Sequence, residues 1–172
     1  MRKPVRNSFE EAAVTASDTL NVDFKAAMRR LASGVGVLTA HGPDGAVGMA
    51  ATSITSLTAE PPAILVCVNR SASIHACLSE GERFCVNLLS RHQSEVSAAF
   101  GSSAKREERF SVGHWSHDAE GLPWLEEAQA NLSCRVAALV PYATHSIVIG
   151  EVSAVRVAET VSPLIYQDGG YL

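Results

Sequence analysis

The sequence contains no long hydrophobic run, and this absence limits where the chain can act. No apolar stretch approaches the roughly 18 residues that a membrane-spanning helix needs. The first segment, Met1 to Leu20, also lacks the continuous apolar core of a secretory signal. We therefore expect a cytoplasmic protein that does not cross a membrane.

Long basic runs are missing as well. Lys and Arg number 14 against 18 Asp and Glu, which gives a formal net charge of −4. A surface that neutralises a phosphate backbone needs clustered Lys or Arg. Nucleic acid is therefore not a predicted partner.

Cysteine is scarce, and its spacing argues against two kinds of stabilised small domain. The chain has four cysteines, with neither the C-x-x-C spacing of a zinc site nor the density of a disulfide framework. All four stand in apolar or strand-like surroundings, which favours buried free thiols. These residues are Cys67, Cys77, Cys85 and Cys134.

Motifs for nucleophilic, glycosidic and metal chemistry are also lacking. The sequence has no G-x-S-x-G elbow and no obvious paired-carboxylate site. Gly34 and Gly36 precede a strand-like run instead of opening a helix, and the third glycine of a dinucleotide fingerprint is missing. His114 and His117 have the spacing of a metal pair, but no third ligand is placed beside them. We predict neither a Rossmann site nor a metal site.

What the sequence does contain is the pattern of one domain. A chain of 172 residues that is 47% hydrophobic is long enough to bury one full core. Residues 1–20 show no sustained period, so we expect a flexible N-terminal arm there and a single domain over residues 21–172. A short amphipathic helix is predicted from Asn21 or Asp23 to about Ala32, lying on the body of the domain.

Short β-rich runs broken by Gly, Pro and Asn dominate the rest of the chain. The turn from Gly42 to Gly45 predicts a hairpin between the first two runs. Helices are expected from about Ser73 to Leu78 and from about Gln93 to Phe100, without a βαβ rhythm. This pattern predicts a mainly β fold, an antiparallel barrel with a few short flanking helices. The six predicted strands are Val35–Ala40, Val47–Thr55, Ala63–Asn69, Arg83–Leu89, Leu132–Val140 and Ser146–Val157.

Two segments have the composition of a ligand site. From Gly48 to Leu57, small residues and hydroxyls would let a flat ligand approach the backbone, although Ser and Thr are also ordinary in exposed strands. From Cys67 to His75, an apolar strand ends in a polar turn that opens a helix. Its backbone N–H groups, its serines and Arg70 either cradle a phosphate or simply cap the helix.

Isolated polar residues elsewhere admit two interpretations each. Asn87 interrupts an apolar strand, so its amide must be hydrogen-bonded to a ligand or to the backbone. Lys105 and Arg109 belong to a mixed-charge stretch that is either a solvated helix end or a clasp for a nucleotide phosphate. His145 stands at the head of an alternating strand, at the surface or against a ligand. Tyr171, in the last segment of the sequence, is a further candidate to lie over the same ligand site as His145.

The joint order of these segments resembles the short-chain flavin reductase family over residues 23–172. The resemblance implies the FMN-binding split β-barrel fold, of antiparallel Greek-key type, and a homodimer. It also implies an NAD(P)H-dependent flavin reductase that passes reduced FMN or FAD to a partner monooxygenase, or a related flavin-dependent reductase. The segments that carry it are Gly34–Thr39, Ala51–Pro62, Asn69–Ser73, Phe84–Leu89, His145–Gly150 and Pro163–Tyr166.

The same resemblance implies where the cofactors lie. The isoalloxazine is expected against the strand from Met49 to Ser53, with the phosphate at the turn that follows Cys67. His145 is expected to be the catalytic residue, which orients the nicotinamide or supports the flavin charge. The implied cofactor-binding residues are Met49, Ala50, Ala51, Thr52, Ser53, Asn69, Arg70, Ser71, Ser73, Asn87, Leu88, Leu89, Lys105, Arg109 and Tyr171.

Three rival functions remain open at this point. The first is a flavoprotein that retains FMN and reduces a dedicated acceptor such as a cobalt corrinoid. The second is a flavin-binding module without turnover, and the third is a haem-binding split barrel with His145 as an axial ligand. Hydride transfer needs no protein nucleophile, because the flavin N5 accepts what the nicotinamide C4 gives. The missing nucleophile motifs agree with that chemistry.

Overall fold

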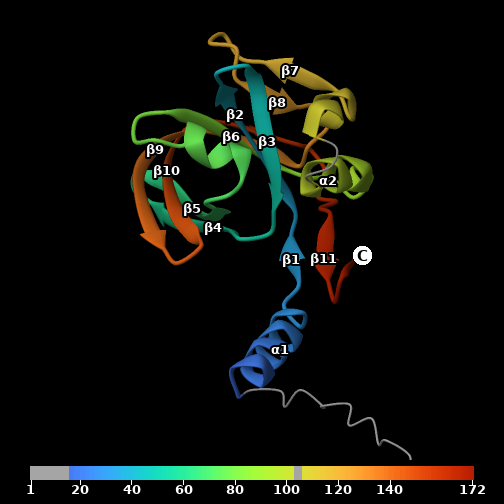
Figure 1. The fold of residues 1–172 in the computed structure, drawn as a ribbon. Coiled ribbons are helices and arrows are strands. Elements are labelled where there is room, and N and C mark those ends of the chain that lie inside the picture. Colours follow the sequence, from blue (N-terminus) through green and yellow to red (C-terminus); the bar gives the residue numbers. More distant parts are fainter. Residues whose placement is uncertain (1–15, 103–105) are drawn as a thin grey trace, which may run out of the picture.

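The computed structural model describes residues 16–102 and 106–172, and this part of the chain is mainly β. Its largest element is a seven-stranded antiparallel sheet with the order β3-β2-β6-β9-β10-β5-β4. Figure 1 shows this sheet curled on itself. The predicted mainly β, antiparallel fold is confirmed. The strands are β2 (Gly36–Gly42), β3 (Gly45–Ala51), β4 (Ile54–Ala59), β5 (Pro62–Asn69), β6 (Arg83–Leu88), β9 (Ala130–Tyr142) and β10 (His145–Val157).

Shorter elements surround the large sheet. β1, β11 and β12 form a small sheet near the chain end, and β7 pairs with β8. The two helical segments predicted after the third strand are present, the first of them as a 3-10 helix. These elements are α1 (Ala16–Met28), β1 (Ser33–Gly34), η1 (Ser73–Cys77), α2 (Ser94–Gly101), η2 (Arg106–Ser111), β7 (Trp115–His117), β8 (Pro123–Leu125), β11 (Ile165–Gln167) and β12 (Gly170–Tyr171).

The predicted hairpin between β2 and β3 is confirmed. Gly42 pairs with Gly45 at the end of an antiparallel register. Gly45 has a φ of +123°, a conformation that residues with a Cβ rarely adopt. The glycine is therefore what allows the chain to reverse within this short turn.

The predicted strand Val47–Thr55 is wrong as a single strand. The chain forms β3 up to Ala51 and then β4 from Ile54, and these two strands are the opposite edges of the seven-stranded sheet. Only Thr52 and Ser53 connect them. The backbone N–H of Cys67 on β5 donates to the carbonyl of Ser53 at 3.3 Å. The curled sheet thus brings its two edges together at the segment where a ligand site was predicted.

The N-terminal helix also differs from the prediction. It begins at Ala16 and ends at Met28, whereas the sequence predicted a helix from Asn21 or Asp23 to Ala32. It projects from the body of the protein instead of packing on the sheet (Figure 1). Its apolar residues are consequently exposed, Phe24 to 61% and Met28 to 47%.

Two apolar clusters form the core and hold the sheet in its curl. The larger lies inside the curled sheet and includes Phe84, Val66 and Val148. Gly150 on β10 provides space for the Phe84 ring, because a Cβ there would lie 2.4 Å from its Cζ. The smaller cluster packs α2 against the outside of β2, with Phe100 at its centre. This second cluster fixes α2 beside β3.

The prediction of four buried thiols holds for two of them. Cys85 and Cys134 are buried, and desolvation raises the pKa of each thiol to about 12. Cys67 and Cys77 are half-buried instead. In the described ranges 16–102 and 106–172, no helix is long and apolar enough to cross a bilayer.

Candidate functional site

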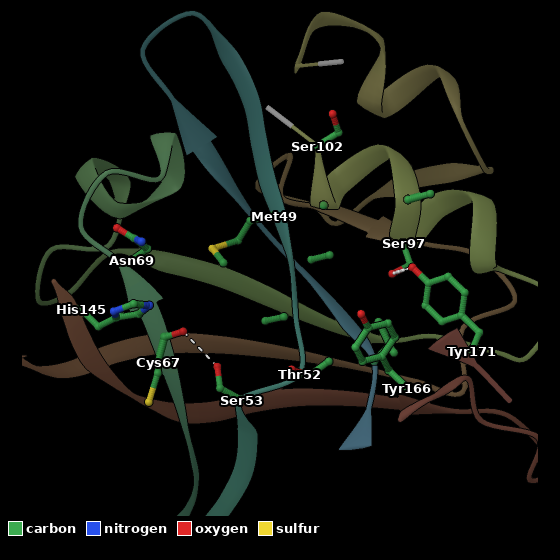
Figure 2. A pocket seen from close by; sticks show the side chains of 15 residues that line it. Met49, Thr52, Ser53, Cys67, Asn69, Ser97, Ser102, His145, Tyr166 and Tyr171 are labelled. Carbon is green, nitrogen blue, oxygen red and sulfur yellow. Dashed lines mark hydrogen bonds between the residues drawn. The ribbon is translucent and has the colours of Figure 1, made fainter. Parts of the chain in front are cut away.

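A cavity of about 540 Å³ opens between β3, the end of β5, α2 and the C-terminal hairpin β11–β12. Figure 2 shows Asn69 and His145 toward one end of it, Tyr166 and Tyr171 toward the other, and Met49 and Thr52 in between. Its lining residues are Val35, Met49, Ala50, Ala51, Thr52, Ser53, Cys67, Asn69, Ser97, Ala98, Gly101, Ser102, His145, Tyr166 and Tyr171.

The floor of the cavity is the end of β3. All five residues of the predicted ring-binding strand, Met49 to Ser53, line it. β3 is an edge strand, so one side of its backbone is not covered by another strand of the sheet. Because most of these side chains are small, a planar ligand can approach the backbone closely there.

The predicted phosphate turn follows β5 and lies at one end of the cavity. The Asn69 side-chain oxygen accepts hydrogen bonds from the backbone N–H and the hydroxyl of Ser71, both at 2.9 Å. This arrangement is a turn closed by its own asparagine. A smaller hollow of about 230 Å³ continues the cavity past Met49, Ala50, Asn69 and Gly101.

Two arginines face that smaller hollow together with Ser71 and Ser73. Arg106 is exposed, while Arg109 is only 7% exposed. Arg109 donates to the carbonyl oxygens of Gly48 at 2.7 Å and Ser102 at 2.6 Å. Burial, followed by the nearby charge of Arg106, lowers the pKa of Arg109. Two cationic side chains beside a serine-rich turn are the donor set that an anionic oxygen group requires.

Arg109 retains an unsatisfied hydrogen-bonding group. Its Nε is buried and has no hydrogen-bond partner in the part of the chain that the structure describes. Its guanidinium makes its hydrogen bonds to neutral carbonyl oxygens, and no carboxylate is paired with it among the described ion pairs. The hollow therefore carries net positive charge that an anion would compensate.

His145 lies at the cavity where the strand pattern placed it. It follows the two-residue turn Ala143–Thr144 between β9 and β10, and it pairs with Asn69 across to β5. The hydroxyl of Thr144 and the His145 Nδ1 are 2.9 Å apart and share a hydrogen bond. This contact orients the ring, so Nε2 is the nitrogen with which His145 would contact a ligand.

Three predicted binding residues lie away from the cavity. Asn87 has 0% exposure and Leu89 has 1%, and Leu88 packs against the core of the curled sheet. The Asn87 amide donates to the carbonyl of Val37 at 2.9 Å, and its oxygen accepts from the backbone N–H of Leu125 at 2.8 Å. Of the two interpretations offered for Asn87, the geometry favours a structural hydrogen bond over ligand contact.

Two further predicted residues lie outside the main cavity or outside the described ranges. Arg70 is exposed and lines an open hollow with Ala143 and Thr144, on the other side of the phosphate turn. Lys105 falls within residues 103–105 and lies outside the described residues. Ser71, Ser73 and Arg109 line the smaller hollow.

Several lining residues escaped the sequence reasoning. Tyr166 and Cys67 belong to segments that the sequence singles out, although neither is among the predicted contacts, and Ser97 has no local signal. Ser97 is buried on α2, so only the packing of that helix beside β3 brings it to the cavity. Tyr166 reaches the cavity because β11 pairs with β1 at Ser33.

Comparison with known proteins assigns the chain to a family. Residues 28–172 match the model of the flavin reductase like domain, and the chain belongs to that family. It is 38% identical over 149 residues to the FMN reductase (NADH) RutF of Variovorax paradoxus, covering 87% of this chain and 83% of that one.

Other relatives are named as components of larger systems. The reductase component of an FADH(2)-dependent resorcinol hydroxylase from a Rhizobium species is 37% identical over 158 residues, covering 91% of this chain and 88% of that one. The styrene monooxygenase flavin reductase of Pseudomonas putida superposes with a TM-score of 0.78 at 32% identity, covering 87% and 96%. An NADH:FAD oxidoreductase of Streptomyces globisporus, solved with NAD and FAD fragments, superposes with a TM-score of 0.82 at 27% identity, covering 92% and 94%.

Proposed function

We propose that this protein is an NAD(P)H-dependent flavin reductase, which transfers hydride from a nicotinamide nucleotide to FMN or FAD. The observation that carries the proposal is the continuity of the cavity over β3 with the hollow that holds Arg106 and Arg109. A flavin mononucleotide has the same two parts, a planar ring system and an anionic phosphate. Family membership and the names of the relatives support the same activity.

The residues present fit a flavin in one orientation. The ring system would lie on the end of β3 and the connection that follows it, Met49 to Ser53, and the ribityl chain would pass Asn69 and Gly101 into the smaller hollow. The phosphate would accept hydrogen bonds from the serines of the turn and from Arg106. The positive charge of the Arg109 guanidinium, which also lines this hollow, would attract the same phosphate.

A bound flavin supplies the hydride acceptor, its N5 atom, so the chain need not supply a nucleophile. The protein contributes geometry: the end of β3 would hold the flavin ring system, and His145 would orient the nicotinamide through Nε2. Thr144 fixes the His145 ring for that role. Correct alignment of donor and acceptor is a large part of the rate enhancement in such reactions.

The relatives favour delivery of reduced flavin to an oxygenase component. One is named as the reductase component of a hydroxylase and another as the flavin reductase of a styrene monooxygenase. We propose an oxygenase of this kind as the partner in electron transfer. The cytoplasmic location expected from the sequence stays a prediction.

The exposed face of α1 supports a homodimer. Phe24, Met28 and Leu31 line a groove of about 610 Å³ between α1 and the C-terminal hairpin. This groove borders the flavin cavity, because Thr52, Ser53 and Tyr166 line both. A second copy seated on α1 would bury an apolar surface and close the open side of the cavity.

The decisive experiment is an assay of NADH and NADPH oxidation with FMN, FAD, riboflavin or no flavin added. Turnover that requires added flavin is the expected result. A yellow protein whose flavin is reduced by NADH but which turns over free flavin slowly would favour the flavoprotein with its own acceptor. Flavin that binds without being bleached by NADH would indicate the non-catalytic module. A protein that binds no flavin at all would overturn the proposal.

A further inference from the structure

The C-terminal hairpin β11–β12 forms the end wall of the cavity. Tyr166 is on the central strand of the small sheet, since it pairs with Ser33 of β1 on one side and Tyr171 of β12 on the other. The Tyr166 backbone is therefore fixed from both sides. The residue is 38% exposed, and it lines the cavity at the end opposite Asn69 (Figure 2).

The neighbouring tyrosine is tied to another element. The Tyr171 hydroxyl donates a hydrogen bond to the Ser97 hydroxyl of α2 at 2.9 Å. The rings of Tyr166 and Tyr171 pack edge to face, with centroids 5.5 Å apart and planes at 64°. Because Tyr171 is tethered through its hydroxyl, its ring restricts the positions that the Tyr166 ring can adopt.

The turn of the hairpin is anchored as well. Arg29, just after α1, donates to the Asp168 carboxylate at 2.9 Å and to the Asp168 carbonyl at 2.8 Å. Gln167 donates to the carbonyl of Arg30 at 3.0 Å. The hairpin is thus held in place by three other elements: β1, the end of α1 and α2.

We infer that Tyr166 is a binding residue for the flavin ring system, at the end remote from the phosphate, and that Tyr171 positions it through Ser97. This inference rests on the proposed function. The ring of Tyr166 adds an aromatic contact to a cavity whose floor consists mostly of small side chains. The contact is to the ring system alone, so it contributes equally to flavins with and without a phosphate.

The inference is therefore tested by comparing the binding of FMN with that of riboflavin, which lacks the phosphate. The dissociation constants of FMN and riboflavin are measured by fluorescence titration for the wild type and for Tyr166→Leu, Tyr166→Phe and Arg106→Ala. We expect Tyr166→Leu to weaken both flavins by the same factor, about three- to tenfold. Tyr166→Phe keeps the ring and should stay within about twofold of the wild type. Arg106→Ala should weaken FMN and leave riboflavin unchanged, because only FMN carries the phosphate.

The positioning role of Tyr171 is tested separately. Tyr171→Phe and Ser97→Ala each remove the hydrogen bond, and each should weaken both flavins to a similar extent. The double variant should be no weaker than either single one, because all three lack the same bond. Tyr142→Phe is the matched control, since Tyr142 is 79% exposed and lies outside the cavity.

The outcomes separate the two proposals. If the wild type binds neither flavin, the proposed function fails. If the wild type binds both and Tyr166→Leu binds riboflavin as tightly as the wild type does, only the assignment of Tyr166 fails. Should Tyr166→Leu not fold, the Tyr171 and Ser97 variants still decide the inference, which their unchanged riboflavin affinity would overturn.

Discussion

The guanidinium of Arg109 donates a hydrogen bond to the carbonyl of Gly48, 2.7 Å away on β3. Through this contact, η2 is joined to the strand that forms the floor of the cavity. A second bond, to the carbonyl of Ser102, connects η2 to the end of α2. One buried side chain thus connects η2, β3 and the end of α2 beside the smaller hollow.

Replacing Arg109 by Lys should therefore affect stability and FMN binding together. A lysine keeps the charge but cannot donate to both carbonyls in the geometry of a guanidinium. We expect the free energy of unfolding to fall by about 1–3 kcal/mol, as for a buried carbonyl left without its donor. FMN should also bind more weakly relative to riboflavin. Urea unfolding and flavin titration measure the two effects, with the exposed Arg91→Lys as the control.

Asn87→Ala should destabilise the fold and spare the flavin site. The substitution leaves the Val37 carbonyl and the Leu125 N–H without their partner, at a cost of about 2–4 kcal/mol. Thermal and urea unfolding measure this, with Asn21→Ala on the exposed helix α1 as the comparison. Weaker flavin binding at unchanged stability would restore the ligand-contact interpretation of Asn87.

His145→Ala should slow hydride transfer without weakening FMN binding. His145 is exposed, so its removal leaves no buried group unsatisfied. We expect the rate of flavin reduction by NADH in stopped-flow absorbance to fall about tenfold, which corresponds to ~1.4 kcal/mol of barrier. His41→Ala, at a surface position outside the cavity, serves as the control. An unchanged rate would remove the role proposed for His145.

The thiols should differ in reactivity, and their titration should lower stability in alkali. Desolvation raises the pKa of Cys85 and Cys134 to about 12, so neither should react with a thiol reagent at pH 8 in the native protein. Cys67 lines the cavity, and bound FMN should slow its labelling.

In the unfolded chain, the thiols of Cys85 and Cys134 ionise near pH 9, so above that pH the unfolded state binds fewer protons than the native state. Stability should therefore fall between about pH 9 and 12. Mass spectrometry of labelled peptides and unfolding curves at several pH values test both statements.

Phe24→Glu should dissociate the proposed homodimer. Phe24 is 61% exposed in the single chain, so a charge there should not disturb the fold of one subunit. In a dimer that buries α1, the same charge would be desolvated without a partner. We expect light scattering to give the mass of a dimer for the wild type and of a monomer for the variant. Val161→Glu is the control, because Val161 is 90% exposed and lies outside the groove. A wild type that is itself monomeric would contradict the dimer.

Much of the fold could be predicted because its signals are local. Alternating apolar residues marked most strands, and Gly42 to Gly45 marked the hairpin that the register confirms. The run from Val47 to Thr55 predicts one strand because its composition does not change where the chain passes from one sheet edge to the other. The helix α1 was expected on the sheet because amphipathic spacing indicates that a helix has an apolar face, but not which partner covers it.

In the candidate site, too, residues with local signals could be predicted and residues brought together by tertiary packing could not. Residues that follow one another along the chain, Met49 to Ser53 and Asn69 to Ser73, could be proposed from composition. Asn87 could not be placed by sequence, because a buried amide in a strand has the same local pattern whether its partner is a ligand or the backbone. Ser97 and Tyr166 were missed because they lie about 70 residues apart in the chain and meet the cavity only through α2 and the C-terminal hairpin.

By itself, the sequence determined the mainly β antiparallel class, the family and the two stretches that supply the cavity floor and the polar turn after β5. These properties depend on the order and periodicity of neighbouring residues, which are visible without coordinates. Only the tertiary structure decided that the sheet edges meet at Thr52 and Ser53, that Arg109 is buried against Gly48, and that two tyrosines form the end wall. Those contacts depend on how the sheet curls and where α2 and the chain end pack, because residues distant in sequence make them.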